Sequence, residues 1–251
     1  MIIDRPHATD VPALRQLWKQ AFGDTDGFLD GFFRTGFAFQ RCRCLTVDDQ
    51  LAAALYWFDC DYQGKNFAYL YAVATDETCR GKGLCRALLE DTHRHLYLMG
   101  YSGCVLVPGS KELFAMYEKM GYLAFYPIEQ KTIPAGDTTI NMQPVTPDTY
   151  MNLRSQRLPA GSILQEEPAF LFASTFCEFY AGEDVLLCCA KENDILYFQE
   201  YLGDPALLGS VVNTLGCQKA FVNLPGGDIP FAMYYPLEEI KAPVYFGIPL
   251  N

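Results

Sequence analysis

The segment from Tyr69 to Leu89, YLYAVATDETCRGKGLCRALL, constrains the fold more than any other part of the chain. A β-rich run ends at Thr75, and a loop with Arg80-Gly81-Lys82-Gly83 leads directly into a helical pattern that starts at Leu84. Such a connection exposes backbone N–H groups at a helix N-terminus, where the helix dipole attracts anions. The glycines let an anion approach the backbone without interference from a Cβ atom. The segment therefore predicts a phosphate-binding loop.

Two common phosphate loops do not fit this sequence. A Walker loop needs Gly-x-x-x-x-Gly-Lys-Ser/Thr, and Gly81-Lys82-Gly83 has neither that spacing nor the hydroxyl. A dinucleotide fingerprint needs Gly-x-Gly-x-x-Gly, but Arg86 occupies the place of the last glycine, and the strands before it form a meander. The remaining pattern is Arg/Gln-x-x-Gly-x-Gly/Ala. Arg80 and Gly83 meet it, and Cys85 meets it imperfectly.

The spacing of apolar residues around this loop predicts an α/β domain. Thr9 or Asp10 is a candidate cap for a helix that carries Leu14, Leu17 and Trp18 on one side, and a second helix follows. Three antiparallel strands are predicted at 42–47, 51–61 and 67–75, then a helix at 84–99, a strand at 104–107, a short helix at 113–119 and a strand at 123–127.

A second motif follows the loop motif by 37 residues. Tyr117-Glu118-Lys119-Met120-Gly121-Tyr122 fits Tyr-x-x-x-Gly-Phe/Tyr at the end of the predicted short helix. With both motifs in this order of elements, residues 1–127 resemble the GCN5-related N-acetyltransferases (GNAT). The resemblance implies the GNAT fold, a mixed and mostly antiparallel central sheet flanked by helices, with acetyl-CoA as co-substrate.

The resemblance also implies a role for each matching residue. Val73, Ala74 and Thr75 match the strand end that lends backbone hydrogen bonds to the pantetheine arm. Tyr117 matches the tyrosine that protonates the leaving thiolate. The pyrophosphate loop corresponds to Arg80, Gly81, Lys82, Gly83, Leu84, Cys85 and Arg86. Glu77 stands where the family commonly has proline, and Cys85 stands where it has Gly or Ala; Cys is small enough for the loop to form.

The second half of the chain reads as a degenerate copy of the first. Val105–Tyr117 (VLVPGSKELFAMY) and Val222–Tyr234 (VNLPGGDIPFAMY) are identical at seven of thirteen positions, and each follows a hairpin, a helix and a short strand. An accidental repeat within a single domain is the alternative. A linker rich in Pro, Thr, Gly and Asp is predicted at 134–148, which gives a catalytic domain at 1–133 and a GNAT-like second domain at 140–251.

The second half lacks the basic loop. Asp204 stands near the start of its helix, where a carboxylate repels pyrophosphate, so we expect no coenzyme A there and a structural or acceptor-site role for Tyr234. This arrangement is similar to the tandem acetyltransferases of the enhanced-intracellular-survival type. Their further C-terminal lipid-carrier-like domain is not expected within these 251 residues.

The chemistry is attack of a neutral amine on a thioester, which requires positioning, an oxyanion donor and an acid for the thiolate. Tyr117 is the candidate acid, and an N–H group near 73–75 is the candidate oxyanion donor. The predicted strand at 67–75 contains no carboxylate or imidazole. Asp59, Asp61, the terminal carboxylate of Asn251 and water stay open as candidates for the base.

Composition narrows the partners. The net charge of −11 disfavours nucleic acid and anionic membranes, and it favours a cationic acceptor such as a polyamine, an aminoglycoside or a basic peptide. No apolar run is long enough to span a bilayer, and no secretory signal begins the sequence. The ten cysteines form no Cys-x-x-Cys pair, which is typical of reduced thiols in the cytoplasm. No metal site is predicted, because the histidines do not share a face.

The sequence thus predicts a cytoplasmic N-acetyltransferase that transfers an acetyl group from acetyl-CoA to a primary amine of a small molecule or peptide. The second half is expected to shape the acceptor site or a homodimer. A non-catalytic acyl-CoA sensor or interaction module is the alternative.

Overall fold

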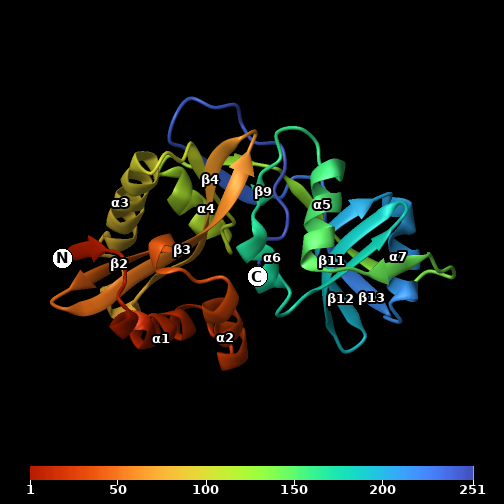
Figure 1. Cartoon of the computed structure of the whole chain (residues 1–251), viewed down its shortest axis with the longest axis horizontal. Helices are drawn as coiled ribbons and strands as arrows, with labels where there is room; N and C mark the ends of the chain where they lie inside the picture. The colour runs from red at the N-terminus through yellow and green to blue at the C-terminus, as the bar shows by residue number, and fades with distance from the viewer. Residues whose placement is uncertain (251) are drawn as a thin grey trace. The chain divides into compact units, whose positions relative to one another are not determined.

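The computed structural model of the chain describes residues 1–250 and divides into two compact units (Figure 1). The first unit contains Met1–Leu123 and Met233–Lys241, and the second contains Ala124–Ala232 with the C-terminal segment from Ala242. Each unit contains a sheet with helices packed against it. The predicted α/β class is confirmed.

The first unit is built on a sheet in which β1, β2, β3, β4, β5 and β14 follow one another. The first four strands pair antiparallel, β5 pairs parallel with β4, and β14 pairs antiparallel with β5. The three predicted antiparallel strands are therefore confirmed. The strands are β1 (Ile2–Asp4), β2 (Cys42–Val47), β3 (Gln50–Tyr62), β4 (Lys65–Thr75), β5 (Gly103–Leu106) and β14 (Ala232–Pro236), with β6 (Leu123–Phe125) where the chain leaves the unit.

Helices cover both faces of this sheet. The α1 helix packs on β3 and β4 through the predicted residues Leu14, Leu17 and Trp18, while α3 packs on β2, β3 and β4. Asp10 precedes α1, but its carboxylate accepts from the N–H of His7 and does not cap the helix. The helices are α1 (Val11–Phe22), α2 (Asp26–Thr35), α3 (Leu84–Leu98) and α4 (Lys111–Glu118), with short 3₁₀ turns η1 (Ala8–Asp10), η2 (Phe39–Arg41) and η3 (Glu77–Cys79).

The second unit repeats this plan on a sheet with the order β7, β13, β12, β11, β10, β8. The predicted hairpin is present, because β11 and β12 pair antiparallel, and β12 and β13 pair parallel. The strands are β7 (Ile128–Pro134), β8 (Met142–Pro144), β9 (Leu164–Gln165), β10 (Glu178–Gly182), β11 (Val185–Glu192), β12 (Ile195–Gly203) and β13 (Lys219–Pro225), and the helices are α5 (Pro147–Arg157), α6 (Glu167–Ala173), η4 (Pro205–Leu207) and α7 (Leu208–Thr214).

The prediction of a linker at 134–148 is wrong. Pro134 pairs with Lys219, and Met142–Pro144 pair with β10, so both ends of this segment belong to the second sheet. The prolines that suggested a linker are the last residues of the two edge strands, where a missing N–H costs no ladder hydrogen bond. The division into domains at 1–133 and 140–251 stays a prediction about independent folding.

The sequence repeat contains one tetrapeptide in two conformations. Phe114–Tyr117 lie in helix α4, whereas the second Phe-Ala-Met-Tyr leads into strand β14. Ser110 caps α4 by accepting from the N–H of Leu113, and the matching positions in the second copy are Gly227 and Pro230, which offer neither the cap nor the N–H. Tyr234 is therefore not the structural counterpart of Tyr117.

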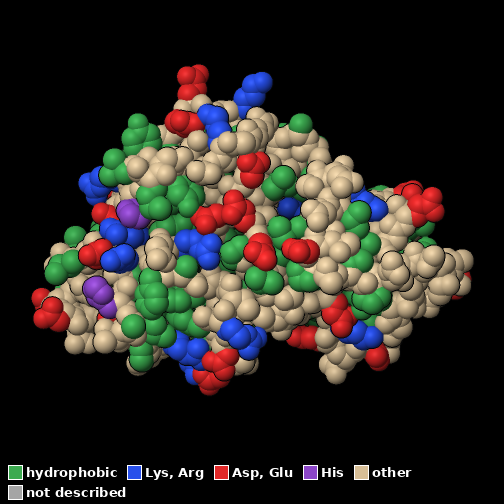
Figure 2. Space-filling model, viewed as in Figure 1, with side chains coloured by type: hydrophobic (Ala, Val, Ile, Leu, Met, Phe, Trp, Pro, Cys, Tyr) green, Lys and Arg blue, Asp and Glu red, His purple; other side chains and the backbone are tan. Residues whose placement is uncertain are grey.

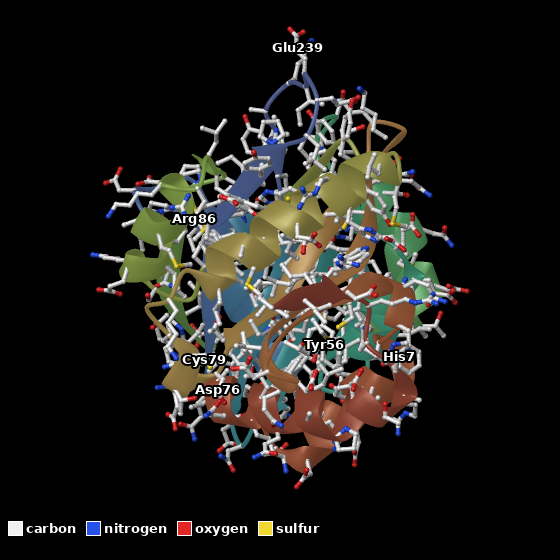
Figure 3. All side chains as sticks on the ribbon, turned by 90° about the vertical axis from the view of Figure 1, so that its left-hand side faces the viewer. His7, Tyr56, Asp76, Cys79, Arg86 and Glu239 are labelled. Carbon is white, nitrogen blue, oxygen red and sulfur yellow. The ribbon has the colours of Figure 1, made fainter. Side chains whose placement is uncertain are left out.

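Three contacts attach the segment 233–241 to the first unit. Strand β14 pairs with β5, and Tyr62 donates a hydrogen bond to the carbonyl of Lys241 at 2.9 Å. The ring of Tyr235 stacks on His93 of α3 with centroids 4.0 Å apart, and the His93 Nε2 lies 2.7 Å from the Tyr122 hydroxyl. Figure 3 shows Glu239 at the tip of the loop that follows β14.

The burial of His93 predicts acid sensitivity. Desolvation lowers the pKa of this imidazole from 6.5 to about 4, so the unfolded chain binds a proton that the folded chain excludes. The stabilisation is complete above pH 6.5 and is lost as the pH falls toward 4, by about 3 kcal/mol in total. In urea unfolding at several pH values, His93→Phe should be less stable at pH 7 but should show a flatter decline below pH 6.5. Equal slopes for the two proteins would contradict this origin.

Side chains of both charges are spread over the surface. On the face that Figure 2 shows, lysines and arginines are interspersed with acidic side chains. Among residues 1–250, none of the helices combines the length and the apolar character that a membrane crossing requires.

Candidate active site

The loop between β4 and α3 has the geometry of an anion site. Gly81 and Gly83 have φ values of +74° and +78°, in the left-handed region, and Gly83 is the N-cap of α3. A Cβ atom on either glycine would meet no heavy atom within 4 Å, so the backbone faces open space. No side chain caps the first turn of α3. Its N–H groups therefore lack a side-chain acceptor and are available to an anion.

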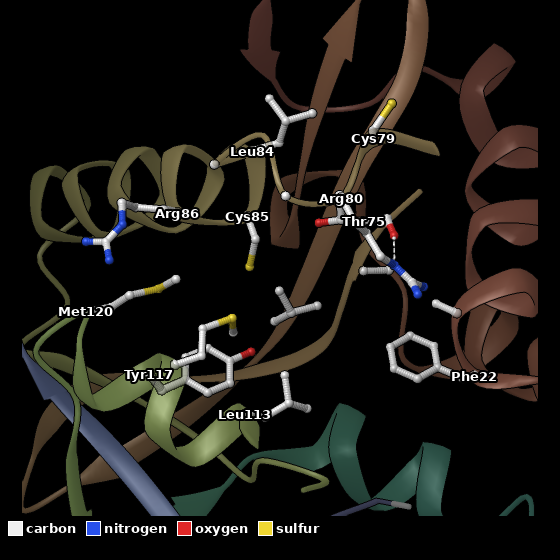
Figure 4. A pocket seen from close by; sticks show the side chains of 16 residues that line it. Phe22, Thr75, Cys79, Arg80, Leu84, Cys85, Arg86, Leu113, Tyr117 and Met120 are labelled. Carbon is white, nitrogen blue, oxygen red and sulfur yellow. Dashed lines mark hydrogen bonds between the residues drawn. The ribbon is translucent and has the colours of Figure 1, made fainter. Parts of the chain in front are cut away.

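A cavity of about 590 Å³ lies against this loop (Figure 4). It brings together the predicted acid Tyr117 and nine of the ten predicted cofactor-binding residues, namely Val73, Ala74, Thr75, Arg80, Gly81, Gly83, Leu84, Cys85 and Arg86. Lys82 does not line the cavity, and its Nζ donates to the carbonyl of Thr78 at 3.1 Å. Figure 3 shows Asp76, Cys79 and Arg86 on the side of the first unit where β4 gives way to α3.

Six further residues line the cavity, and the sequence did not single them out. They are Ala21, Phe22, Cys79, Leu113, Met116 and Met120. The last three lie four before, one before and three after Tyr117 on or just beyond α4, so helical spacing from the motif tyrosine was a usable signal. Ala21 and Phe22 end α1, and no motif marks them.

Two features of β4 open the sheet at the cavity. The parallel pairing of β4 with β5 covers only Phe67–Tyr69, so the end of β4 has no paired neighbour on that side. A β-bulge also interrupts the pairing with β3, because Ala54 pairs with Ala74 while Tyr56 pairs with Tyr71. The extra residue includes Ala72 at a φ of +48°, in the left-handed region that favours glycine. The bulge turns the Val73–Thr75 backbone relative to the rest of the strand.

This conformation predicts that Ala72→Gly stabilises the protein. An L-residue in the left-handed region costs about 1–2 kcal/mol, which exceeds the added backbone entropy of glycine. The free energy of unfolding in urea should rise by about 0.5–1 kcal/mol. Ala68→Gly, at a buried position of β4 without positive φ, serves as the matched control and should destabilise the protein. A loss of stability in Ala72→Gly equal to that of the control would refute the strain.

Tyr117 presents its hydroxyl to the cavity. Its side chain is only 5% exposed, and its ring packs edge-on against Tyr122 with centroids 5.2 Å apart. The hydroxyl points into the cavity and has no hydrogen-bond partner among residues 1–250 (Figure 4). Burial, and secondarily the neighbouring Cys85 thiol, raise the pKa of Tyr117 well above its usual range. The phenol therefore stays protonated at neutral pH and can donate a proton.

The basic side chains near the loop leave their charges unneutralised. Arg80 donates from Nε to the carbonyl of Thr75 at 3.2 Å, and its guanidinium points toward Phe22 (Figure 4). Arg86 is exposed and lies 3.9 Å from Glu90, a distance typical of a weak surface ion pair. These cations add to the field of the helix N-terminus.

The candidate bases do not lie in the cavity. Asp59 binds Arg41 at 3.1 Å and accepts from the Tyr101 hydroxyl, while Asp61 accepts from the N–H of Gly64 at 3.0 Å. Neither lines the cavity, and no lining residue carries a carboxylate or an imidazole. Asn251 lies outside the described residues.

The corresponding loop of the second unit carries its own anion. Asp204 follows β12 and accepts a hydrogen bond from the N–H of Ala206 at 2.9 Å, at the start of η4. A side-chain carboxylate thus occupies an amide that a phosphate would need. All ten cysteines of the chain are free thiols, and among residues 1–250 no three metal-ligating side chains lie together.

Comparisons with known proteins agree with this geometry. Residues 3–124 match the family model described as "Acetyltransferase (GNAT) domain". No curated protein sequence matches the chain. A GCN5-related N-acetyltransferase from Anabaena variabilis is 16% identical, with a TM-score of 0.72 over 94% of this chain and 73% of that one. Eis1 from Mycobacterium abscessus is 10% identical, with a TM-score of 0.68 over 95% of this chain and 74% of that one.

A third structure has nearly the same extent as this chain. A putative acetyltransferase from Pyrococcus horikoshii is 11% identical, with a TM-score of 0.62 over 98% of this chain and 93% of that one. Because these likenesses cover both units, the second unit shares the GNAT-like fold, as the sequence predicted. Through residues 3–124 the chain belongs to the GNAT family and is an acyltransferase.

Proposed function

We propose that the chain transfers an acetyl group from acetyl-CoA to a primary amine of a small molecule or peptide. One observation carries the proposal: the open N–H groups around Gly81 and Gly83, the free end of β4 and the Tyr117 hydroxyl all meet at one cavity. In this assignment the residues from Arg80 to Arg86 hold the pyrophosphate, with Lys82 contributing its backbone and its charge from outside the cavity. Val73–Thr75 hydrogen-bond the pantetheine arm.

The acyl transfer follows from these positions. The amine lone pair attacks the thioester carbonyl carbon, and an N–H group near Val73 stabilises the oxyanion that forms. The C–S bond then breaks, the thiolate takes the Tyr117 proton, and the amine loses one proton, so the products are an N-acetyl amide and coenzyme A. Tyr117 recovers its proton from solvent. The proton of the amine leaves through water, because no lining side chain serves as its acceptor.

The second unit has another role in this proposal. Its loop holds Asp204 where the first unit has basic residues, so we assign coenzyme A to the first unit only. The second unit shapes the acceptor site or a homodimer. The net charge of −11 favours a cationic acceptor, and the free thiols fit a cytoplasmic location.

Thiol footprinting tests coenzyme A binding whatever the acceptor amine is. Cys79 and Cys85 line the cavity, whereas the other eight cysteines are buried and act as internal standards. Alkylation with N-ethylmaleimide followed by mass spectrometry should show Cys79 protected by coenzyme A. Cys85 should react slowly even without coenzyme A, because burial raises its pKa to about 11. Unchanged labelling of Cys79 at saturating coenzyme A would contradict the assigned site.

The lack of a lining carboxylate or imidazole favours one alternative, an acyl-CoA sensor without turnover. Coenzyme A release from acetyl-CoA, measured with a panel of amines, distinguishes the two. A sensor would protect Cys79 but release no coenzyme A above the hydrolysis background with any amine.

A further inference from the structure

A second cavity of about 500 Å³ lies on one face of the sheet of the second unit. It extends over the neighbouring strands β12, β13 and β7. The pairings Tyr197–Phe221, Phe221–Thr132 and Asn223–Gln130 place these side chains next to one another on that face. The residues that alternate with them point into the core formed with α7. We call this cavity the sheet groove.

The floor of the sheet groove is an aromatic platform. The rings of Tyr197 and Phe221 have centroids 5.5 Å apart and planes tilted by 32°. Phe221 is 38% exposed, which is unusual for a phenylalanine on a sheet without a covering partner. The ammonium of Lys219 lies 5.2 Å from the centroid of the Phe221 ring and provides a hydrogen-bond donor at the edge of the platform. The platform therefore offers a flat apolar surface to a ligand.

Polar side chains surround this platform. Gln130 and Asn223 are joined by a hydrogen bond of 3.3 Å from Nε2 to Oδ1, which orients both amides and leaves the Gln130 oxygen and the Asn223 nitrogen available. The Thr132 hydroxyl and the Gln199 amide also line the groove. None of the lining residues is acidic, and the lining residue Lys131 is paired with Glu129 at 3.0 Å. The groove thus combines neutral donors and acceptors with little net charge.

We propose that the sheet groove binds a hexopyranose ring of a carbohydrate. A pyranose has an apolar face of C–H bonds that packs on aromatic rings, and a rim of neutral hydroxyls that each donate and accept. The platform and the amide rim supply both complements. A nucleotide would also stack on aromatic rings, but its phosphate needs cations, and Lys131 is neutralised in a chain with a net charge of −11.

Saturation-transfer NMR with the full chain tests the proposal. The probes are the methyl glycosides of glucose, galactose and mannose, N-acetylglucosamine and its trisaccharide, with uridine 5′-monophosphate as the competing class. We expect at least one saccharide to bind through its ring C–H protons. Phe221→Ala and Asn223→Ala should each weaken that binding about tenfold or more. Tyr97→Ala removes a side chain that is 58% exposed on α3 and is the matched control, with unchanged binding.

Three outcomes would overturn the proposal. These are no binding of any saccharide, binding that survives both groove substitutions, and binding of uridine monophosphate with loss in the same variants. Circular dichroism establishes that each variant is folded, and Asn223→Ala decides the matter if Phe221→Ala is not. The test is independent of acetyl transfer, because none of these residues lines the active-site cavity.

Discussion

The double variant Arg80→Ala/Gly83→Asp should lose measurable binding of acetyl-CoA, with an affinity at least about 100-fold weaker by calorimetry, or about 3 kcal/mol. The substitutions remove a guanidinium that lines the cavity and place a carboxylate at the N-terminus of α3, where an anion is meant to bind. Acetyl transfer should disappear at any practical concentration of acetyl-CoA.

A matched control separates electrostatics from backbone strain. Gly64 has a φ of +77° in the turn between β3 and β4, with no heavy atom within 4 Å of an added Cβ atom, so Gly64→Asp imposes a similar conformational cost far from the loop in sequence. Its affinity for acetyl-CoA should equal that of the wild type. Wild-type affinity in the double variant, or a comparable loss in Gly64→Asp, would remove the case for this loop.

Tyr117→Phe should lower kcat by about 100-fold or more while the affinity for acetyl-CoA changes by less than about twofold. The hydroxyl has no partner among residues 1–250, so phenylalanine fits the same space and the melting temperature should hardly change. Because burial raises the pKa of Tyr117, ionisation of this phenol should not reduce kcat as the pH rises to about 10.

The control for this variant is Tyr62→Phe. Tyr62 is equally buried, but its hydroxyl bonds the carbonyl of Lys241 and does not line the cavity. It should lose a little stability and keep its kcat. If Tyr117→Phe lowered affinity and kcat together, or lowered neither, Tyr117 would not be the acid.

The local parts of the fold were predictable. The loop 80–83, the start of α3 and Tyr117 are recorded in short motifs whose glycines and spacing have a direct conformational meaning. Strand pairing from β2 to β4 followed from alternation and turns, because neighbours in the sheet are neighbours in the sequence.

The remaining features depend on contacts between residues far apart in the chain. Phe22 lines the cavity because α1 packs on β4, and its own sequence surroundings do not record this. The tetrapeptide Phe-Ala-Met-Tyr has no fixed preference, so a cap at Ser110 and a proline at Pro230 decide between helix and strand. Pro134 and Pro144 suggested a linker because edge-strand prolines cannot be told from loop prolines by composition.

The pairing of β5 with β14 has a consequence for biosynthesis. Residues 103–106 wait for residues 233–236 to leave the ribosome before the first sheet receives this strand, and nearly all of the second unit is translated in between. Until then β5 presents one unpaired edge, where a nascent chain is open to wrong partners. Proteolysis of stalled nascent chains should therefore find the amino-terminal unit sensitive until the strand has emerged, however early its loop and helices form.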